Sequence, residues 1–246
     1  MRAALLLLAF VALFAAGCGG SNTSAPADSM PSTTGSTAKT PTTASTIPLE
    51  LFYLASDGRL VAERGEVPST QAVASAALHE LATSPPGTTT SVPDGLSVAI
   101  TKGDAKVIGA TLTKAALAQV VYTLTEFPTV QTVNGETRAE VEDFVPVILV
   151  EHPTPDEEVS SPLHVTGNAN TYEATVEYEL KDGGGTVIAK GFTTATSGSG
   201  TRGTFEFTVP FKVDSAQDGT LVVYETSAEN GSRIHERAIP LRLSPQ

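Results

Sequence analysis

The stretch TYEATVEYEL (residues 171–180) alternates apolar and polar side chains over its whole length. Tyr172, Val176 and Leu180 fall on one side of such a segment, and Glu177 falls on the other. Because successive side chains of a β-strand point to opposite faces, the pattern predicts a strand with one face on a core. Together with the segments described next, this strand predicts that the second half of the chain is all-β.

Other segments of that half carry the same signal. The stretch TFEFTVPF (residues 204–211) repeats the alternation with phenylalanine and valine on one side. Further strands are predicted at residues 145–151, 163–167, 187–196, 220–227 and 234–243. Seven strands in about 100 residues predict a β-sandwich, which we place at residues 143–246. The chain has one cysteine and no tryptophan, which excludes the disulfide-and-tryptophan core of antibody domains.

Residues 48–138 mix strand and helix signals. LELFYLASDGRLV predicts two short strands around an Asp57-Gly58 turn, and STQAVASAALHELATSPPG predicts a helix capped by Ser69. A second strand pair (residues 96–112), a second helix with its apolar stripe through Leu117 and Leu124, and a short strand in TVQTVNGE follow. The predicted order is ββαββαβ, an α+β domain with two helices on one sheet.

Both halves resemble known domain families. LFYLASDGRLVAERGEVP, HELATSPP and above all QVVYTLTEFP (residues 119–128) resemble the GerMN family of sporulation and spore germination. VEHPTPDEEVSSPLHVTGNANTYEATVEYEL and LVVYETSAENGS resemble the immunoglobulin-like domain found beside GerMN in bacterial spore-germination proteins. The resemblance implies a role in interactions, and in spore formers it implies sporulation and germination complexes. The loop after the strand near Val107 is shorter than is usual in that family, which removes a segment that could carry binding determinants.

The start of the chain predicts export and lipid anchoring. Residues 3–16 are almost entirely apolar and would form a helix of about 21 Å, too short to span a bilayer core. The sequence AAGC resembles a bacterial lipobox, although Ala15 stands where leucine is usual. That resemblance implies a signal peptide at residues 1–17 and lipid attachment at Cys18. The alternative is an ordinary signal peptide with Cys18 incidental.

A tether is predicted at residues 18–47. In residues 21–47, 14 of 27 residues are serine or threonine, with interspersed prolines and few apolar side chains. Such a composition buries too little apolar surface to offset chain entropy. We therefore expect a disordered spacer that lifts the folded domains off a membrane.

Composition and motifs narrow the function. The formal net charge of −12 disfavours nucleic acid and anionic lipid head groups as partners. None of the four histidines, His79, His152, His164 and His235, stands at a metal-ligand spacing, and no nucleophile-elbow, dinucleotide or phosphate-loop motif occurs. No catalytic, cofactor-binding or metal-binding residue is predicted. A hydrolase remains a third hypothesis, because catalytic triads are assembled in space.

Three features of the sequence allow two interpretations each, one structural and one functional. Residues 156–158 (DEE) are read as a solvated loop, with a calcium site as the alternative. TGNAN (residues 166–170) is read as a turn, with hydrogen bonding to a glycan as the alternative. Tyr122, Phe127 and Tyr172 are candidates for a docking surface, although core packing is the preferred interpretation of Tyr122.

These observations predict a lipoprotein on the extracytoplasmic face of the cell membrane. We expect a non-enzymatic docking or scaffolding module without cofactor. Its expected partners are the membrane, through the N-terminal lipid, and other envelope proteins or a cell-wall polymer. The alternative function is binding of a cell-wall glycan or peptide. A homo-oligomer formed through an edge strand of the N-terminal domain is a further hypothesis.

Overall fold

The computed structural model describes residues 45–245. The predicted signal peptide, the lipid-attachment residue Cys18 and the predicted tether up to residue 44 lie outside the described residues. Within residues 45–245, no helix is long and apolar enough to cross a membrane.

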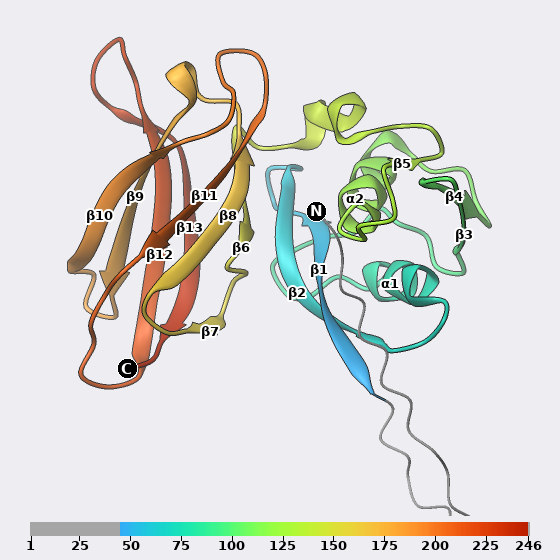
Figure 1. The fold of residues 1–246 in the computed structure, drawn as a ribbon, viewed down its shortest axis with the longest axis horizontal. Coiled ribbons are helices and arrows are strands. Elements are labelled where there is room, and N and C mark those ends of the chain that lie inside the picture. The colour runs from blue at the N-terminus through green and yellow to red at the C-terminus, as the bar shows by residue number, and fades with distance from the viewer. Residues whose placement is uncertain (1–44, 246) are drawn as a thin grey trace, which may run out of the picture. The chain divides into compact units, whose positions relative to one another are not determined.

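A long hairpin opens the described chain (Figure 1). Strand β1 (Thr46–Leu54) pairs antiparallel with β2 (Leu60–Pro68). Gly58, with φ of 74°, provides the left-handed residue of the predicted turn. β1 begins at Thr46, so the predicted tether is wrong at its last two residues. The reason is that Ile47 pairs with Val67 and packs against the core.

Two helices follow the apolar patterns seen in the sequence. Helix α1 (Val73–Leu81) buries Leu78 and Leu81, and helix α2 (Lys114–Leu124) is capped by Thr113, whose side chain accepts the N–H of Ala116. The predicted cap at Ser69 is wrong, because α1 begins at Val73. Its N-cap, Ala72, offers no capping side chain.

The strands of the N-terminal domain form two sheets. Strands β3 (Ser97–Thr101), β4 (Asp104–Ile108) and β5 (Thr132–Val133) make a three-stranded sheet, separate from β1–β2. The predicted order ββαββαβ is confirmed, but the single sheet is wrong.

Side chains of α2 explain the separate hairpin. The buried side chain of Thr123 accepts the N–H of Phe52 at 3.1 Å, and the buried amide of Gln119 donates to the Phe52 carbonyl at 3.1 Å. The backbone of β1, which pairs with β2, is thus satisfied at Phe52 by side chains of a helix and not by a second neighbouring strand.

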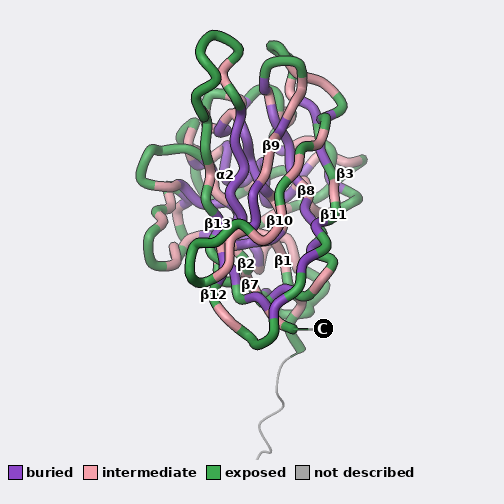
Figure 2. Tube along the Cα trace, turned by 90° about the vertical axis from the view of Figure 1, so that its left-hand side faces the viewer, coloured by how far each residue is buried: buried purple, intermediate pink, exposed green. Residues whose placement is uncertain are grey.

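The C-terminal half is a two-sheet sandwich. Its strands are β6 (Ile148–His152), β7 (Glu157–Val159), β8 (Leu163–Ala169), β9 (Thr175–Asp182), β10 (Val187–Thr194), β11 (Gly203–Val209), β12 (Gln217–Thr226) and β13 (Arg233–Leu243). One sheet has the order β10-β9-β12-β13-β7 and the other the order β11-β8-β6. Figure 2 shows the inner parts of these strands buried and the connecting loops exposed. The predicted all-β class is confirmed.

Residues 166–169 of TGNAN, read from the sequence as a turn, belong to strand β8. The sandwich also corrects two further details of the sequence-based prediction. The alternation of residues 171–180 breaks at its start, where a short turn, η2 (Tyr172–Ala174), leaves Tyr172 57% exposed. The cause is a distant loop: Ser199 donates to the carbonyl of Thr171, and a Cβ on Gly198 would lie 2.5 Å from the nitrogen of Ala174.

The acidic segment at residues 156–158 is the second correction. Glu157 and Glu158 belong to β7, which pairs in parallel with the end of β13 and is not a solvated loop. This pairing joins residues more than 80 positions apart, and nothing local in the sequence indicates it.

Candidate functional site

The N-terminal domain and the sandwich meet at a junction rich in arginine. A 3-10 segment, η1 (Arg138–Phe144), connects them, and the described residues 45–245 belong to one compact unit. Within residues 45–245, the arginine–carboxylate pairs that bind the N-terminal domain and η1 to the sandwich are Arg64–Glu157 (3.2 Å), Arg138–Glu151 (2.6 Å), Arg202–Glu142 (2.8 Å) and Arg237–Asp57 (3.1 Å).

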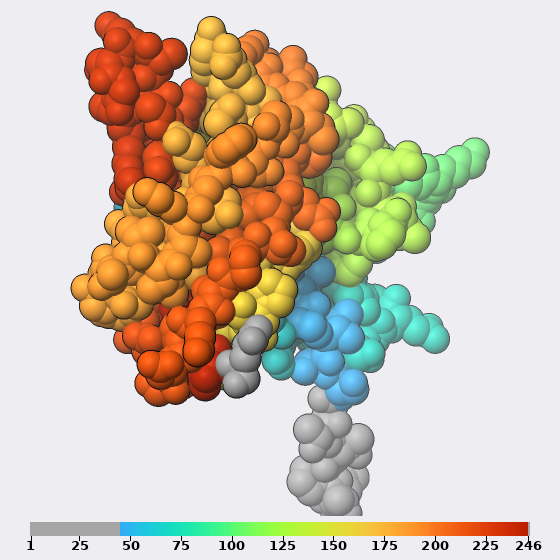
Figure 3. Space-filling model, turned by 60° about the vertical axis from the view of Figure 1, so that its left-hand side comes forward, coloured from blue at the N-terminus to red at the C-terminus, as the bar shows by residue number. Residues whose placement is uncertain are grey.

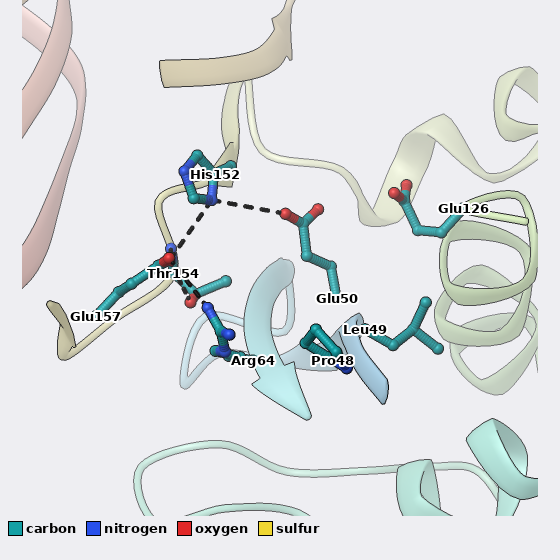
Figure 4. Close-up of a pocket in the computed structure, with 8 residues that line it drawn as sticks. All are labelled: Pro48, Leu49, Glu50, Arg64, Glu126, His152, Thr154 and Glu157. Atoms are coloured by element: carbon teal, nitrogen blue, oxygen red, sulfur yellow. Dashed lines mark hydrogen bonds and ion pairs between the residues drawn. The ribbon is translucent and has the colours of Figure 1, made fainter. Parts of the chain in front are cut away.

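A pocket of about 300 Å³ lies at this junction, and we call it the Glu50 pocket. Figure 4 shows its lining, which comes from β1, β2, the loop after α2, β6 and β7. The lining residues are Pro48, Leu49, Glu50, Arg64, Glu126, His152, Thr154 and Glu157. Both domains are therefore needed to build it.

Glu50 is the carboxyl group in this pocket with the weakest ion pairing. Its carboxyl group faces His152, with 3.9 Å between Oε1 and Nδ1, and no nitrogen of a described Lys, Arg or His side chain lies closer. Burial raises the pKa of Glu50 to about 8, and the carboxylates of Glu126, Glu151 and Glu157 add to the rise. Arg138 opposes the shift without cancelling it. A group with such a pKa in a cleft is a candidate functional residue.

Glu157, in contrast, is well paired. Its carboxylate accepts hydrogen bonds from the backbone N–H and the hydroxyl of Thr154, both at 3.0 Å, and pairs with Arg64. His152 Nδ1 lies 3.5 Å from its second oxygen. Glu157 therefore holds the wall of the pocket in place, whereas Glu50 is free to meet a ligand.

Arg138 ties the pocket to the helix behind it. Its guanidinium binds the carboxylates of Glu126 and Glu151, donates to the Thr125 hydroxyl at 2.7 Å, and lies 4.4 Å from the centre of the Tyr122 ring. Burial alone would lower the pKa of Arg138, but the two carboxylates raise it. Arg138 is therefore fully charged, and its guanidinium nitrogens already have hydrogen-bond partners within the chain.

Carboxyl groups outnumber guanidinium groups at the junction. Four carboxylates, those of Glu50, Glu126, Glu151 and Glu157, surround two guanidinium groups. Within the described residues, no group of three or more His, Cys, Asp or Glu is arranged to hold a metal ion. The carboxyl groups offer hydrogen-bond acceptors of the kind that an ammonium or guanidinium group needs.

The residues that the sequence singled out do not lie together in one site. Cys18 lies outside the described residues. Tyr122 is fully buried, which confirms the core interpretation. His79 and Asp94 form an exposed pair at 3.1 Å, and His235 lies 3.8 Å from Glu225.

Sequence reasoning missed the main site. Glu50 had one local signal, because it interrupts an otherwise apolar run in β1. Glu126, Arg138 and Glu151 had no local signal, since they converge only in the folded chain.

Comparison with known proteins agrees with the two halves of the fold. Residues 50–134 match the family described as sporulation and spore germination, and residues 147–232 match the immunoglobulin-like domain of bacterial spore germination. The chain therefore contains a GerMN-type domain followed by an immunoglobulin-like domain of the spore-germination type. The GerMN domain supplies Glu50, Arg64 and Glu126 to the pocket, and the immunoglobulin-like domain supplies the rest of its charged lining.

A solved structure is distantly similar. It contains the tandem GerMN domains of the sporulation protein GerM from Bacillus subtilis, with 18% sequence identity and a TM-score of 0.33. The match covers 82% of this chain and 62% of that one. No curated protein matches the chain.

Proposed function

We propose that this GerMN-family protein is a lipid-anchored docking module on the extracytoplasmic face of the cell membrane. It is non-enzymatic and binds an envelope protein through a lysine or arginine side chain that enters the Glu50 pocket. The anchor is a lipid on Cys18, and the serine- and threonine-rich tether spaces the domains from the membrane. The lipobox-like AAGC sequence and the composition of the tether support this part of the proposal.

One observation carries the docking role. Glu50 is a carboxyl group with a pKa of about 8 in a pocket of about 300 Å³, and the nearest described basic group, the ring of His152, lies 3.9 Å away. A cationic side chain next to Glu50 supplies the missing partner and makes the ionised form favourable again. Binding therefore releases a proton below pH 8, and the affinity rises with pH toward that value.

The experiment that tests docking is site-specific photo-crosslinking in cells. A photoreactive amino acid replaces Pro48, an exposed residue that lines the pocket, in the full chain. We expect one discrete protein adduct, and we expect Glu50→Lys to abolish it because reversal of the charge repels a basic side chain. The matched control places the photoreactive residue at Lys190, on β10 far along the chain from the pocket.

The outcome is decisive in both directions. An adduct that survives Glu50→Lys means that the partner does not use the pocket. No adduct at Pro48, together with one at the control position, places docking on another surface.

A second candidate function is binding of a cell-wall glycan. A second junction pocket favours it, and its lining includes Asn168 and Asn170 from the TGNAN segment.

A further inference from the structure

The second pocket shares no lining residue with the Glu50 pocket, and we call it the Tyr122 pocket. It has a volume of about 420 Å³ and is built by α2, η1, the end of β8 and the loop between β10 and β11. In the space-filling view, the orange β10–β11 region lies against the yellow-green surface that contains η1 (Figure 3). Its size is within the range of about 300–1,000 Å³ that is usual for small-molecule sites.

One residue that lines this pocket has a buried hydroxyl without a partner among the described residues. Tyr122 lines it and is 0% exposed, and its hydroxyl has no hydrogen-bond partner among the described residues. Burial raises the pKa of Tyr122 to about 12, so the hydroxyl is protonated and able both to donate and to accept. Leaving such a group unpaired costs about 1–3 kcal/mol, a penalty that a ligand hydroxyl would relieve.

The charges around the pocket are already neutralised. Arg202 binds Glu142 through Nε, the amide oxygen of Asn168 through Nη1 at 2.7 Å, and the carbonyl of Pro146 through Nη2 at 2.9 Å. Each nitrogen of the Arg138 guanidinium likewise has an oxygen partner. Because no guanidinium nitrogen is left over, the pocket offers little to a carboxylate or phosphate.

Uncharged polar residues also line the pocket. The side-chain oxygen of Asn170 accepts the N–H of Gly200 at 2.9 Å, which fixes the loop over the pocket, and the exposed Thr201 adds a hydroxyl. A carboxamide, hydroxyls and backbone groups are the set that hydrogen-bonds a saccharide.

We propose that the Tyr122 pocket binds an uncharged oligosaccharide, one of whose hydroxyl groups reaches the hydroxyl of Tyr122. The proposal deepens the glycan-binding candidate and does not depend on docking at Glu50. The Glu50 pocket takes a cation, whereas the Tyr122 pocket takes a neutral ligand.

The test is calorimetric titration of the full chain with two neutral probes. Chitotriose represents an N-acetylated β-linked glycan, and maltotriose represents a plain α-linked glucan. We expect binding of at least one probe, and we expect Tyr122→Phe to weaken it about tenfold, the effect of about 1.4 kcal/mol for one lost hydrogen bond. Thr201→Val, at the exposed rim, should weaken the same probe without disturbing the core.

Controls separate this inference from the docking role. Glu50→Gln should bind the sugar as the unmodified chain does, because it changes only the other pocket. Binding of neither probe, or equal binding by the parent chain and both pocket variants, overturns the proposal. Neither result bears on crosslinking at Pro48.

Discussion

At the scale of single residues, Glu50 is the described carboxyl group whose pKa is raised the most. Its folded-state pKa of about 8 lies above the ordinary value of 4.5, so the folded chain binds a proton that the unfolded chain releases. Stability contributed by this group is therefore present at low pH and declines as the pH rises from about 4.5 to about 8.

Glu50→Gln should flatten this pH dependence. We expect the variant to be more stable than the parent chain at pH 8.5 by about 1–3 kcal/mol, and the gap to close toward pH 4.5. The gain stays below the full linkage value because 26% of the Glu50 side chain is exposed. Urea unfolding across this pH range measures it, with the exposed Glu229→Gln as control. Parallel pH profiles for the parent and Glu50→Gln would show that Glu50 is not perturbed.

Cys18 carries the proposal of anchoring. We expect Cys18→Ser to abolish lipid attachment and to move the chain from the membrane fraction into the medium, since stable anchoring requires two or more acyl chains. Mass spectrometry of the N-terminal peptide checks the modification directly. A free thiol on an unacylated N-terminus in the parent protein would contradict the anchor.

At the scale of elements, side chains of α2 form the hydrogen bonds with the backbone of β1 that a further strand would otherwise form. Thr123→Val keeps the shape of the side chain but leaves the N–H of Phe52 without an acceptor. We expect a loss of about 1–3 kcal/mol in the free energy of unfolding. Thr201→Val, on an exposed loop, is the matched control and should change it by less than about 0.5 kcal/mol. An equal effect of the two variants would mean that the contact contributes nothing.

The segment around Arg138 fastens the helix α2 to the sandwich. Arg138→Met removes the partner of Glu151 and Glu126 and should destabilise the chain by about 3–5 kcal/mol, because it leaves half-buried carboxylates unpaired. Arg242→Met breaks an ion pair whose side chains are 66% and 73% exposed, and should cost less than about 1 kcal/mol. Chemical denaturation compares the two, and similar losses would refute a structural role for Arg138.

The elements also show which parts of the fold could be predicted from the sequence. The periods of 2 and 3.6 predicted the order ββαββαβ and most sandwich strands, because these signals are local. The separate β1–β2 hairpin was missed because Gln119 and Thr123 read as ordinary helix positions. The break at Tyr172 depends on Gly198 and Ser199, which lie more than 20 residues away.

At the scale of the whole molecule, the junction makes two domains behave as one. The candidate site was unpredictable from sequence for this reason: Glu50, Glu126, Arg138 and Glu151 come from four separate segments and meet only when both domains have folded. The resemblances to the GerMN family and to the immunoglobulin-like domain predicted the two folds. They did not predict how the two domains contact each other.

The arginine pairs at the junction should couple the unfolding of the two domains. We expect calorimetry of the full chain to show a single transition, and the double variant Arg138→Met/Arg202→Met to split it into two. Two transitions in the parent chain would mean that the junction does not couple the domains.

The most direct measurement of the docking account is a carbon-13 NMR titration of the Glu50 carboxyl group in the full chain, with and without N-acetyl-lysine methylamide. We predict an apparent pKa of about 8 for the free chain, which falls when the lysine derivative is added. A pKa near the ordinary value of 4.5, or a titration curve that saturating lysine derivative leaves unchanged, would contradict the claim that this pocket receives a cationic side chain.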